Sequence, residues 1–166
     1  MAPIYVLKLH QGPLGGASAH WGILVPLPHS IYDDWGTPDS GTFFHARKNM
    51  GTCFNLLSES QTQWERREVY LSQLPSLADC RLLNDTNVEA EQVNVAYTVI
   101  SDNRQFNWVM QNCQNWVIEV LKNLGLPEAV FQQMTRLGYV PLGDTSCVKC
   151  ARSSLSLNCS CRRQRR

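Results

Sequence analysis

The feature that most constrains the fold is an apolar run near the N-terminus. Residues 18–26 read Ser-Ala-His-Trp-Gly-Ile-Leu-Val-Pro, and the run is nearly continuous after His20. A half-buried strand alternates apolar and polar side chains, whereas a strand without that alternation is buried on both faces. The sequence therefore predicts a central strand here that is buried on both faces.

The neighbouring segments predict further strands. Segments 4–10 and 41–47 are rich in β-branched and aromatic residues, and the link 27–40 contains prolines and glycines typical of a long turn. Another strand is predicted over 52–57, and an edge strand over 64–71, where apolar residues stand among charges. Segment 77–83 fits either a strand or a helix.

Helical spacing of apolar residues follows in the second half of the chain. It predicts helices over 87–100, from residue 113 to 124 and over 127–137, with a loop at 102–107. Strands first and helices afterwards indicate an α+β fold, in which helices pack on an antiparallel sheet. We expect one globular domain over residues 1–144, followed by a flexible Cys- and Arg-rich tail over 145–166.

Composition bears on the cellular setting. The seven cysteines are an odd number and no signal peptide or transmembrane segment is evident, which predicts an intracellular, cytoplasmic protein with free thiols. Residues 147–166 carry six Lys or Arg and no acid, which leaves nine basic and 14 acidic residues in 1–146. The body is thus mildly acidic, and the basic tail is expected to contact anionic surfaces.

Cys113 is the candidate nucleophile. Asn112 is a favoured N-cap residue, so Cys113 falls in the first turn of a helix, where unpaired N–H groups and the helix dipole favour the thiolate. A thiolate needs a base, and His20 and His45 lie in two predicted neighbouring strands. The alternative is that Cys113 is a small buried residue and that both histidines are core or cross-strand residues.

These residues resemble a known pattern. His20-Trp21 in a strand, His45 after a hairpin-like link, and Asn112-Cys113-x-x-Trp116 at a helix start are similar to the circularly permuted papain-like (NlpC-type) cysteine fold. That group includes lecithin:retinol acyltransferase-like proteins and PPPDE isopeptidases. The resemblance implies Cys113 as nucleophile, His20 as general base and His45 as the residue that orients it. The pattern also resembles small fungal proteins of the same build.

Other residues have weaker or structural interpretations. Gln111 and Asn112 are expected to cap the helix or to contribute to an oxyanion site. Trp21 and Trp116 fit the core better than a substrate platform. Cys53 and Cys80 are expected to be buried. The first expectation for the tail is a disordered segment without a cofactor. The alternative is a structural zinc site formed by the thiols of four tail cysteines, Cys147, Cys150, Cys159 and Cys161.

The predicted function is thiol-dependent hydrolysis or acyl transfer through an acyl-enzyme at Cys113. Its substrate would be an amide, ester or thioester of a small molecule, a lipid or a peptide tail. Three alternatives stay open: a non-catalytic binding protein on the same scaffold, an accessory protein of secondary metabolism, and a functional tail that binds zinc or nucleic acid.

Overall fold

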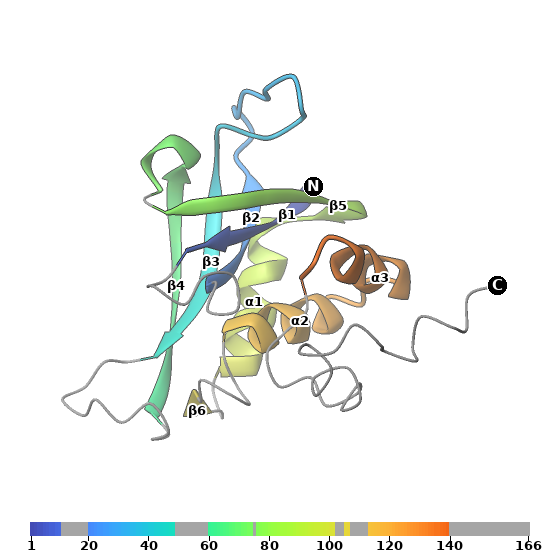
Figure 1. Cartoon of the computed structure of the whole chain (residues 1–166). Coiled ribbons are helices and arrows are strands. Elements are labelled where there is room, and N and C mark those ends of the chain that lie inside the picture. The colour runs from blue at the N-terminus through green and yellow to red at the C-terminus, as the bar shows by residue number, and fades with distance from the viewer. Residues whose placement is uncertain (11–19, 49–59, 75, 102–104, 107–112, 140–166) are drawn as a thin grey trace, which may run out of the picture.

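The chain forms an antiparallel sheet with helices on one face (Figure 1). The computed structural model describes residues 1–10, 20–48, 60–74, 76–101, 105–106 and 113–139. Within these ranges the sheet has six strands in the order β5-β1-β2-β3-β4-β6. The strands are β1 (Ala2–Leu9), β2 (His20–Pro26), β3 (Ser40–Lys48), β4 (Ser60–Tyr70), β5 (Leu77–Val88) and β6 (Gln105–Phe106). The α+β prediction is confirmed.

The described part of the chain also contains three α-helices, which follow or interrupt its last strands. They are α1 (Ala90–Ser101), α2 (Cys113–Asn123) and α3 (Glu128–Arg136), and a short 3-10 turn, η2 (Leu71–Gln73), joins β4 to β5. Gly125 adopts a φ of +70° just after α2, a backbone conformation that favours glycine. Pro127 then serves as the N-cap residue of α3, in extended conformation. The predicted stop of α2 before Gly125 and the predicted start of α3 near Pro127 are therefore confirmed.

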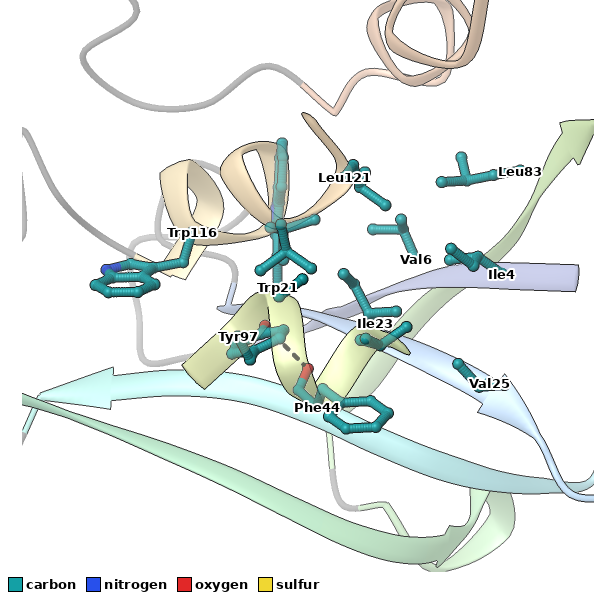
Figure 2. Close-up of a cluster of buried hydrophobic side chains, with 14 of the residues drawn as sticks. Ile4, Val6, Trp21, Ile23, Val25, Phe44, Leu83, Tyr97, Trp116 and Leu121 are labelled. Atoms are coloured by element: carbon teal, nitrogen blue, oxygen red, sulfur yellow. Dashed lines mark hydrogen bonds between the residues drawn. The ribbon is translucent and has the colours of Figure 1, made fainter. Parts of the chain in front are cut away.

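Strand β2 is buried along its whole length, because cores lie on both of its faces. The helix-side core includes Trp21, Ile23 and Val25 of β2, together with residues of α1 and α2 (Figure 2). The far-side core includes Leu24 of β2 and lies on the opposite face; its other buried members are Tyr5, Leu7, Phe43, Val69, Leu71 and Leu74. Successive side chains of one strand thus enter different cores, as the unbroken apolar run predicted.

Two contacts fix α1 against the sheet. The hydroxyl of Tyr97 donates a hydrogen bond to the carbonyl oxygen of Phe44 at 3.3 Å, and the two rings stack with centroids 5.9 Å apart (Figure 2). Near the start of the helix, Arg66 Nη1 of β4 lies 2.9 Å from Glu91 Oε2. These contacts bring α1 across the side of β3 and β4 that also carries the helix-side core.

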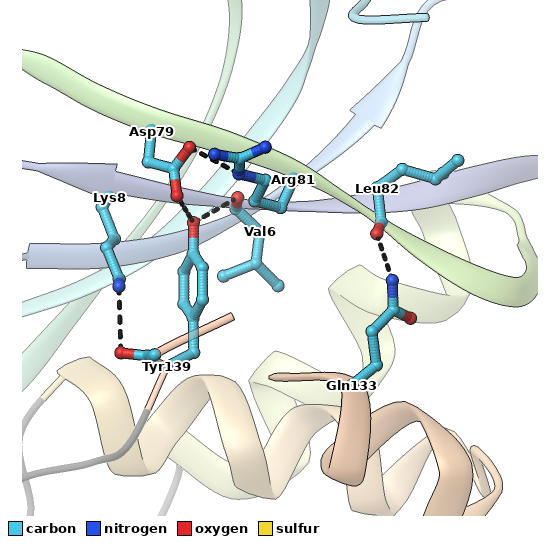
Figure 3. Close-up of polar contacts among 8 residues, drawn as sticks. Val6, Lys8, Asp79, Arg81, Leu82, Gln133 and Tyr139 are labelled. Carbon is cyan, nitrogen blue, oxygen red and sulfur yellow. Dashed lines mark hydrogen bonds and ion pairs between the residues drawn. The ribbon is translucent and has the colours of Figure 1, made fainter. Parts of the chain in front are cut away.

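The segment around α3 is tied to β5 and β1 by polar side chains (Figure 3). Tyr139 donates to the carbonyl oxygen of Val6 at 3.1 Å, and the Lys8 ammonium lies 3.9 Å from the centre of the Tyr139 ring. Gln133 accepts from the N–H of Asn84 and donates to the carbonyl oxygen of Leu82, both at 2.9 Å. Since β5 is an edge strand of the sheet that the described residues form, Gln133 occupies backbone groups with which a further strand would pair.

The predicted boundaries differ from the structure in places. Segment 77–83 belongs to strand β5, and the expected loop at 102–107 contains the two-residue strand β6. Strand β6 pairs only with Ser60 and Gln61, so residues 64–70 lie on an edge of the described sheet, as predicted. The strand predicted over 52–57 lies outside the described residues. No helix in the described part of the chain combines the length and the apolar character needed to cross a membrane.

Candidate active site

His20 and His45 form a hydrogen-bonded pair. Their side chains come from β2 and β3, and His20 Nε2 lies 2.8 Å from His45 Nδ1. The rings are nearly perpendicular, with centroids 4.9 Å apart, and both residues are buried, at 4% and 7% exposure. Two strands that the sequence predicted as neighbours thus bring the two histidines together.

Glu65 adds a carboxylate to this pair. It lies directly opposite His45 in the β3–β4 register, and its Oε2 atom is 3.3 Å from His45 Nε2. The Glu65 side chain is 33% exposed, so the carboxylate connects the buried imidazoles to solvent. The arrangement is a three-membered series of ionisable side chains, Glu65, His45 and His20, across three adjacent strands.

The carboxylate determines how protons are distributed along the series. A negative charge beside His45 Nε2 favours the tautomer with the proton on that atom, which leaves Nδ1 as an acceptor. His45 Nδ1 then accepts from His20 Nε2, and in this tautomer Nδ1 is the unprotonated nitrogen of the His20 ring.

Packing holds the His45 ring in place. Phe43 stacks on it, with ring centroids 4.9 Å apart and an interplanar angle of 19°. Gly22 makes room for Phe43, because a Cβ atom at Gly22 would lie 2.3 Å from Phe43 Cε2. Since side chains alternate along a strand, His20 lies on the same face of β2 as Leu24, and His45 on the same face of β3 as Phe43. The histidine pair thus borders the far-side core.

Cys113 approaches the same end of β2 from the other side of the sheet. It is the first residue of α2 and belongs to the helix-side core, where it is 7% exposed. The β2–β3 ladder ends at Ile23↔Phe44, so it stops before Trp21. At this open end the backbone N–H of Trp21, the residue next to His20, is directed at the Cys113 sulfur.

The pKa of Cys113 differs from the expectation for a helix start. Backbone N–H groups of Trp21, Cys113 and Gln114 stabilise the thiolate, and the latter two belong to the first turn of α2, where the sequence predicted this effect. Burial outweighs them and raises the pKa of the Cys113 thiol to about 11. The resting side chain is therefore a neutral thiol near pH 7, and any nucleophilic step at Cys113 must begin with transfer of its proton to a base.

The remaining predicted residues are placed as follows. Trp21 and Trp116 are 1% and 2% exposed and pack in the helix-side core. His10 and His29 are exposed. Cys80 is only partly buried. Seven of the predicted residues lie outside the described ranges, namely Cys53, Gln111, Asn112 and the tail cysteines Cys147, Cys150, Cys159 and Cys161. Among the described residues no group of three His, Cys, Asp or Glu side chains could hold a metal ion.

Two surface grooves are lined by described residues. The larger, of about 580 Å³, lies beside the β2–β3 link, and the smaller, of about 250 Å³, lies between α2 and α3. Neither is lined by Cys113, His20 or His45.

Comparisons with known proteins give no matching family model, no matching curated protein and no matching solved structure. The interpretation of the site therefore depends on the geometry of its own residues.

Glu65 is the residue that sequence reasoning missed. It stands in the predicted edge strand 64–71, in which charged residues are ordinarily solvent-facing. The signal that singles it out is the β3–β4 register, which places it opposite His45. Trp64 faces the helix-side core, and alternation therefore places Glu65 on the histidine side. The alternation was visible in the sequence, but the register was not.

Proposed function

We propose that the protein is a thiol-dependent acyl hydrolase or acyltransferase that forms an acyl-enzyme at Cys113. The observation that carries the proposal is that the Glu65–His45–His20 series ends beside Cys113. Its last residue, His20, directly precedes Trp21 in β2, and the backbone N–H of Trp21 is directed at the Cys113 sulfur. His20 is the proposed base, and His45 and Glu65 are positioning residues that fix its tautomer. The substrate is an ester, thioester or amide of a small molecule, a lipid or a peptide tail.

The proposed reaction begins with transfer of the thiol proton of Cys113 to His20 Nδ1. The sulfur attacks the acyl carbonyl carbon and forms a C–S bond, while the carbonyl π electrons move onto oxygen. Backbone N–H groups at the start of α2 stabilise that oxyanion. Its collapse breaks the bond to the leaving group, which takes the proton from His20. Water, or a second nucleophile, then releases the acyl group and restores the thiol.

The relay suits a thiol of raised pKa. Proton transfer to His20 creates an imidazolium in a buried place, which is costly unless a charge of opposite sign lies near. Through His45, the Glu65 carboxylate supplies that charge. The proposal requires the His20 ring to reach the Cys113 sulfur at the open end of the β2–β3 ladder.

A second candidate, a non-catalytic scaffold, is favoured by two observations. Burial raises the pKa of the Cys113 thiol to about 11, and the sulfur belongs to the helix-side core, whereas the histidines border the far-side core. In that case Cys113 is a packing residue, and His20 and His45 are buried cross-strand residues that hydrogen-bond to each other. The two candidates differ in whether Cys113 becomes acylated.

The test is acylation by p-nitrophenyl butyrate, followed by intact-mass measurement and peptide mapping. We expect one butyryl group on Cys113, removable by neutral hydroxylamine as a thioester. Cys113→Ser should abolish the thioester, whereas Cys80→Ser should leave it. His20→Gln should slow acylation at least about 100-fold, in line with the usual contribution of a general base. His29→Gln is the matched control, because His29 is exposed and remote in sequence from the series.

The scaffold candidate gives a different outcome. Acylation would then be absent, or spread over several cysteines at rates that His20→Gln does not change. Either result would exclude the acyl-enzyme proposal, provided that the variants unfold at the same urea concentration as the parent chain.

A further inference from the structure

The loop between β2 and β3 projects beyond one end of the sheet (Figure 1). Its own polar groups hold its backbone by hydrogen bonds. At its tip, Asp33 Oδ1 accepts from the N–H groups of Trp35 and Thr37, at 2.9 and 2.7 Å. The Tyr5 hydroxyl, from the sheet below, donates to the carbonyl oxygen of Gly36 at 2.6 Å. Gly36 has a φ of +73°, so the turn uses a residue that tolerates that backbone.

The base of the loop is fixed as well. Asp39 donates its N–H to the carbonyl oxygen of Ile31 at 2.8 Å, and its Oδ1 atom accepts from the N–H of Ile31 at 3.0 Å. Leu71 of η2 donates its N–H to the Asp39 carbonyl oxygen at 2.8 Å. The loop therefore enters any complex already ordered, which removes an entropic cost of binding.

This ordered loop exposes large apolar side chains. Trp35 is 91% exposed, Ile31 71% and Tyr32 47%. The internal hydrogen bonds fix the backbone of the loop without burying these three side chains. Rigid Trp and Tyr side chains are the residues most enriched at binding hot spots.

A groove of about 580 Å³ adjoins the loop, and Tyr32 belongs to both. Much of its lining is apolar and comes from the start of β1 with the residue before it, the end of β2 with the two residues after it, the end of β5 and the start of α1. These residues are Met1, Ala2, Pro3, Val25, Pro26, Leu27, Pro28, Val88 and Ala90. A volume of this size accommodates a few side chains of a ligand. Its prolines have little conformational freedom to lose, so the groove is largely pre-formed.

The surface around the groove is acidic. Residues 27–40 contain three aspartates and no Lys or Arg, and Glu68 and Glu89 line the groove. Its one lining arginine, Arg66, is matched by Glu91 at 2.9 Å. Negative charge of this density disfavours an anionic membrane and favours a basic polypeptide.

We propose that the Trp35 loop and the adjoining groove bind a basic peptide segment that carries an apolar anchor residue, presented by a protein partner. The apolar side chain enters the groove beside Tyr32, Lys or Arg side chains face Glu68 and Glu89, and the Trp35 ring offers its face to a further cation. The surface lies at the opposite ends of β2 and β3 from His20 and His45, so it stands apart from the proposed acyl chemistry.

The test uses the full chain and fluorescence anisotropy of a labelled peptide of repeating Lys-Leu-Pro units. We expect Trp35→Ala to raise Kd about 10-fold, as expected for a hot-spot residue. Asp34→Asn should raise it about threefold and weaken the salt dependence. Val95→Ala is the matched control, since Val95 is 55% exposed on α1, and it should leave Kd unchanged.

Three results would overturn the proposal. One is a Kd that Trp35→Ala does not change, and another is equal binding of a Glu-Leu-Pro peptide. The third is Trp35-dependent binding to vesicles of phosphatidylcholine and phosphatidylserine without binding of the basic peptide, which would assign the loop to a lipid surface.

Discussion

Gly22 links the core to the histidine pair, and Gly22→Ala tests that link. A Cβ atom at Gly22 would lie 2.3 and 2.6 Å from two atoms of the Phe43 ring and 2.8 Å from the Phe44 carbonyl oxygen. All three distances are shorter than real Cβ contacts, and the oxygen belongs to the backbone. The ring must therefore move, and the strand cannot easily follow it. Because Phe43 stacks on His45, the displacement reaches the histidine pair.

The expected loss of stability follows from two opposing effects. Overpacking a core costs about 1–3 kcal/mol, and replacing a strand glycine returns about 0.5–1 kcal/mol by restricting the unfolded chain. With both a ring and a backbone oxygen in the way, we expect the free energy of unfolding to fall by about 2 kcal/mol. For a chain of this size the melting temperature should drop by about 4–8 °C.

Urea unfolding followed by far-UV circular dichroism measures the effect. Phe43→Leu in the same chain should relieve part of the clash, so the double variant should be more stable than the sum of the single effects by at least about 0.5 kcal/mol. Gly36→Ala is the control for backbone strain without overpacking. Gly36 has a φ of +73°, which strains an alanine, and a Cβ atom there would have no neighbour within 4 Å. An unfolding free energy of Gly22→Ala within about 0.5 kcal/mol of the parent, or strict additivity with Phe43→Leu, would refute the reasoning.

Further expectations concern the polar contacts and the buried thiols. Tyr139→Phe removes the hydroxyl that bonds a β1 carbonyl and should cost about 1 kcal/mol in urea unfolding. Gln133→Ala uncovers the β5 edge, and sedimentation velocity should then show self-association. Burial raises the pKa of the Cys113 thiol from an ordinary value of 9.0 to about 11 in the folded protein. The contribution of this thiol to the free energy of unfolding is therefore complete below pH 9 and is lost as the pH rises toward 11. In urea unfolding across this pH range, Cys113→Ala should reduce the decline in the free energy of unfolding by about 2 kcal/mol. Glu65→Gln should slow acylation by p-nitrophenyl butyrate about 10-fold while changing stability by less than about 0.5 kcal/mol.

Much of the fold was accessible from the sequence because its signals are local. The unbroken apolar run after His20 predicted a strand buried on both faces, and the two cores around β2 confirm it. The order of elements predicted helices on an antiparallel sheet. Strand β5 was ambiguous because its segment mixes charges and apolar residues without a clear period, and its pairing with β1, far away in the sequence, decided its structure.

The candidate site was accessible only in part, because its decisive features are not local. The sequence predicted that His20 and His45 lie in neighbouring strands, and the structure places them in hydrogen-bond contact. The role of Glu65 depends on the β3–β4 register, which no local pattern encodes. The pKa of Cys113 depends on how deeply α2 is buried. The sequence shows that the residue starts a helix, but the desolvation that outweighs the helix-terminal N–H groups comes from tertiary packing.

Glu65→Gln distinguishes a catalytic relay from a histidine pair that only packs. The reason is that the negative charge of Glu65 stabilises the histidine pair only when that pair becomes positively charged. In the resting protein the series can be neutral at both imidazoles, and a glutamine at position 65 keeps an uncharged oxygen atom beside His45 Nε2. Stability should therefore change little in either case. When His20 accepts the thiol proton, the buried pair becomes cationic, and only the carboxylate offsets that charge. A slower acylation at unchanged stability is thus the signature of a relay, whereas equal rates would mean that the histidines only pack.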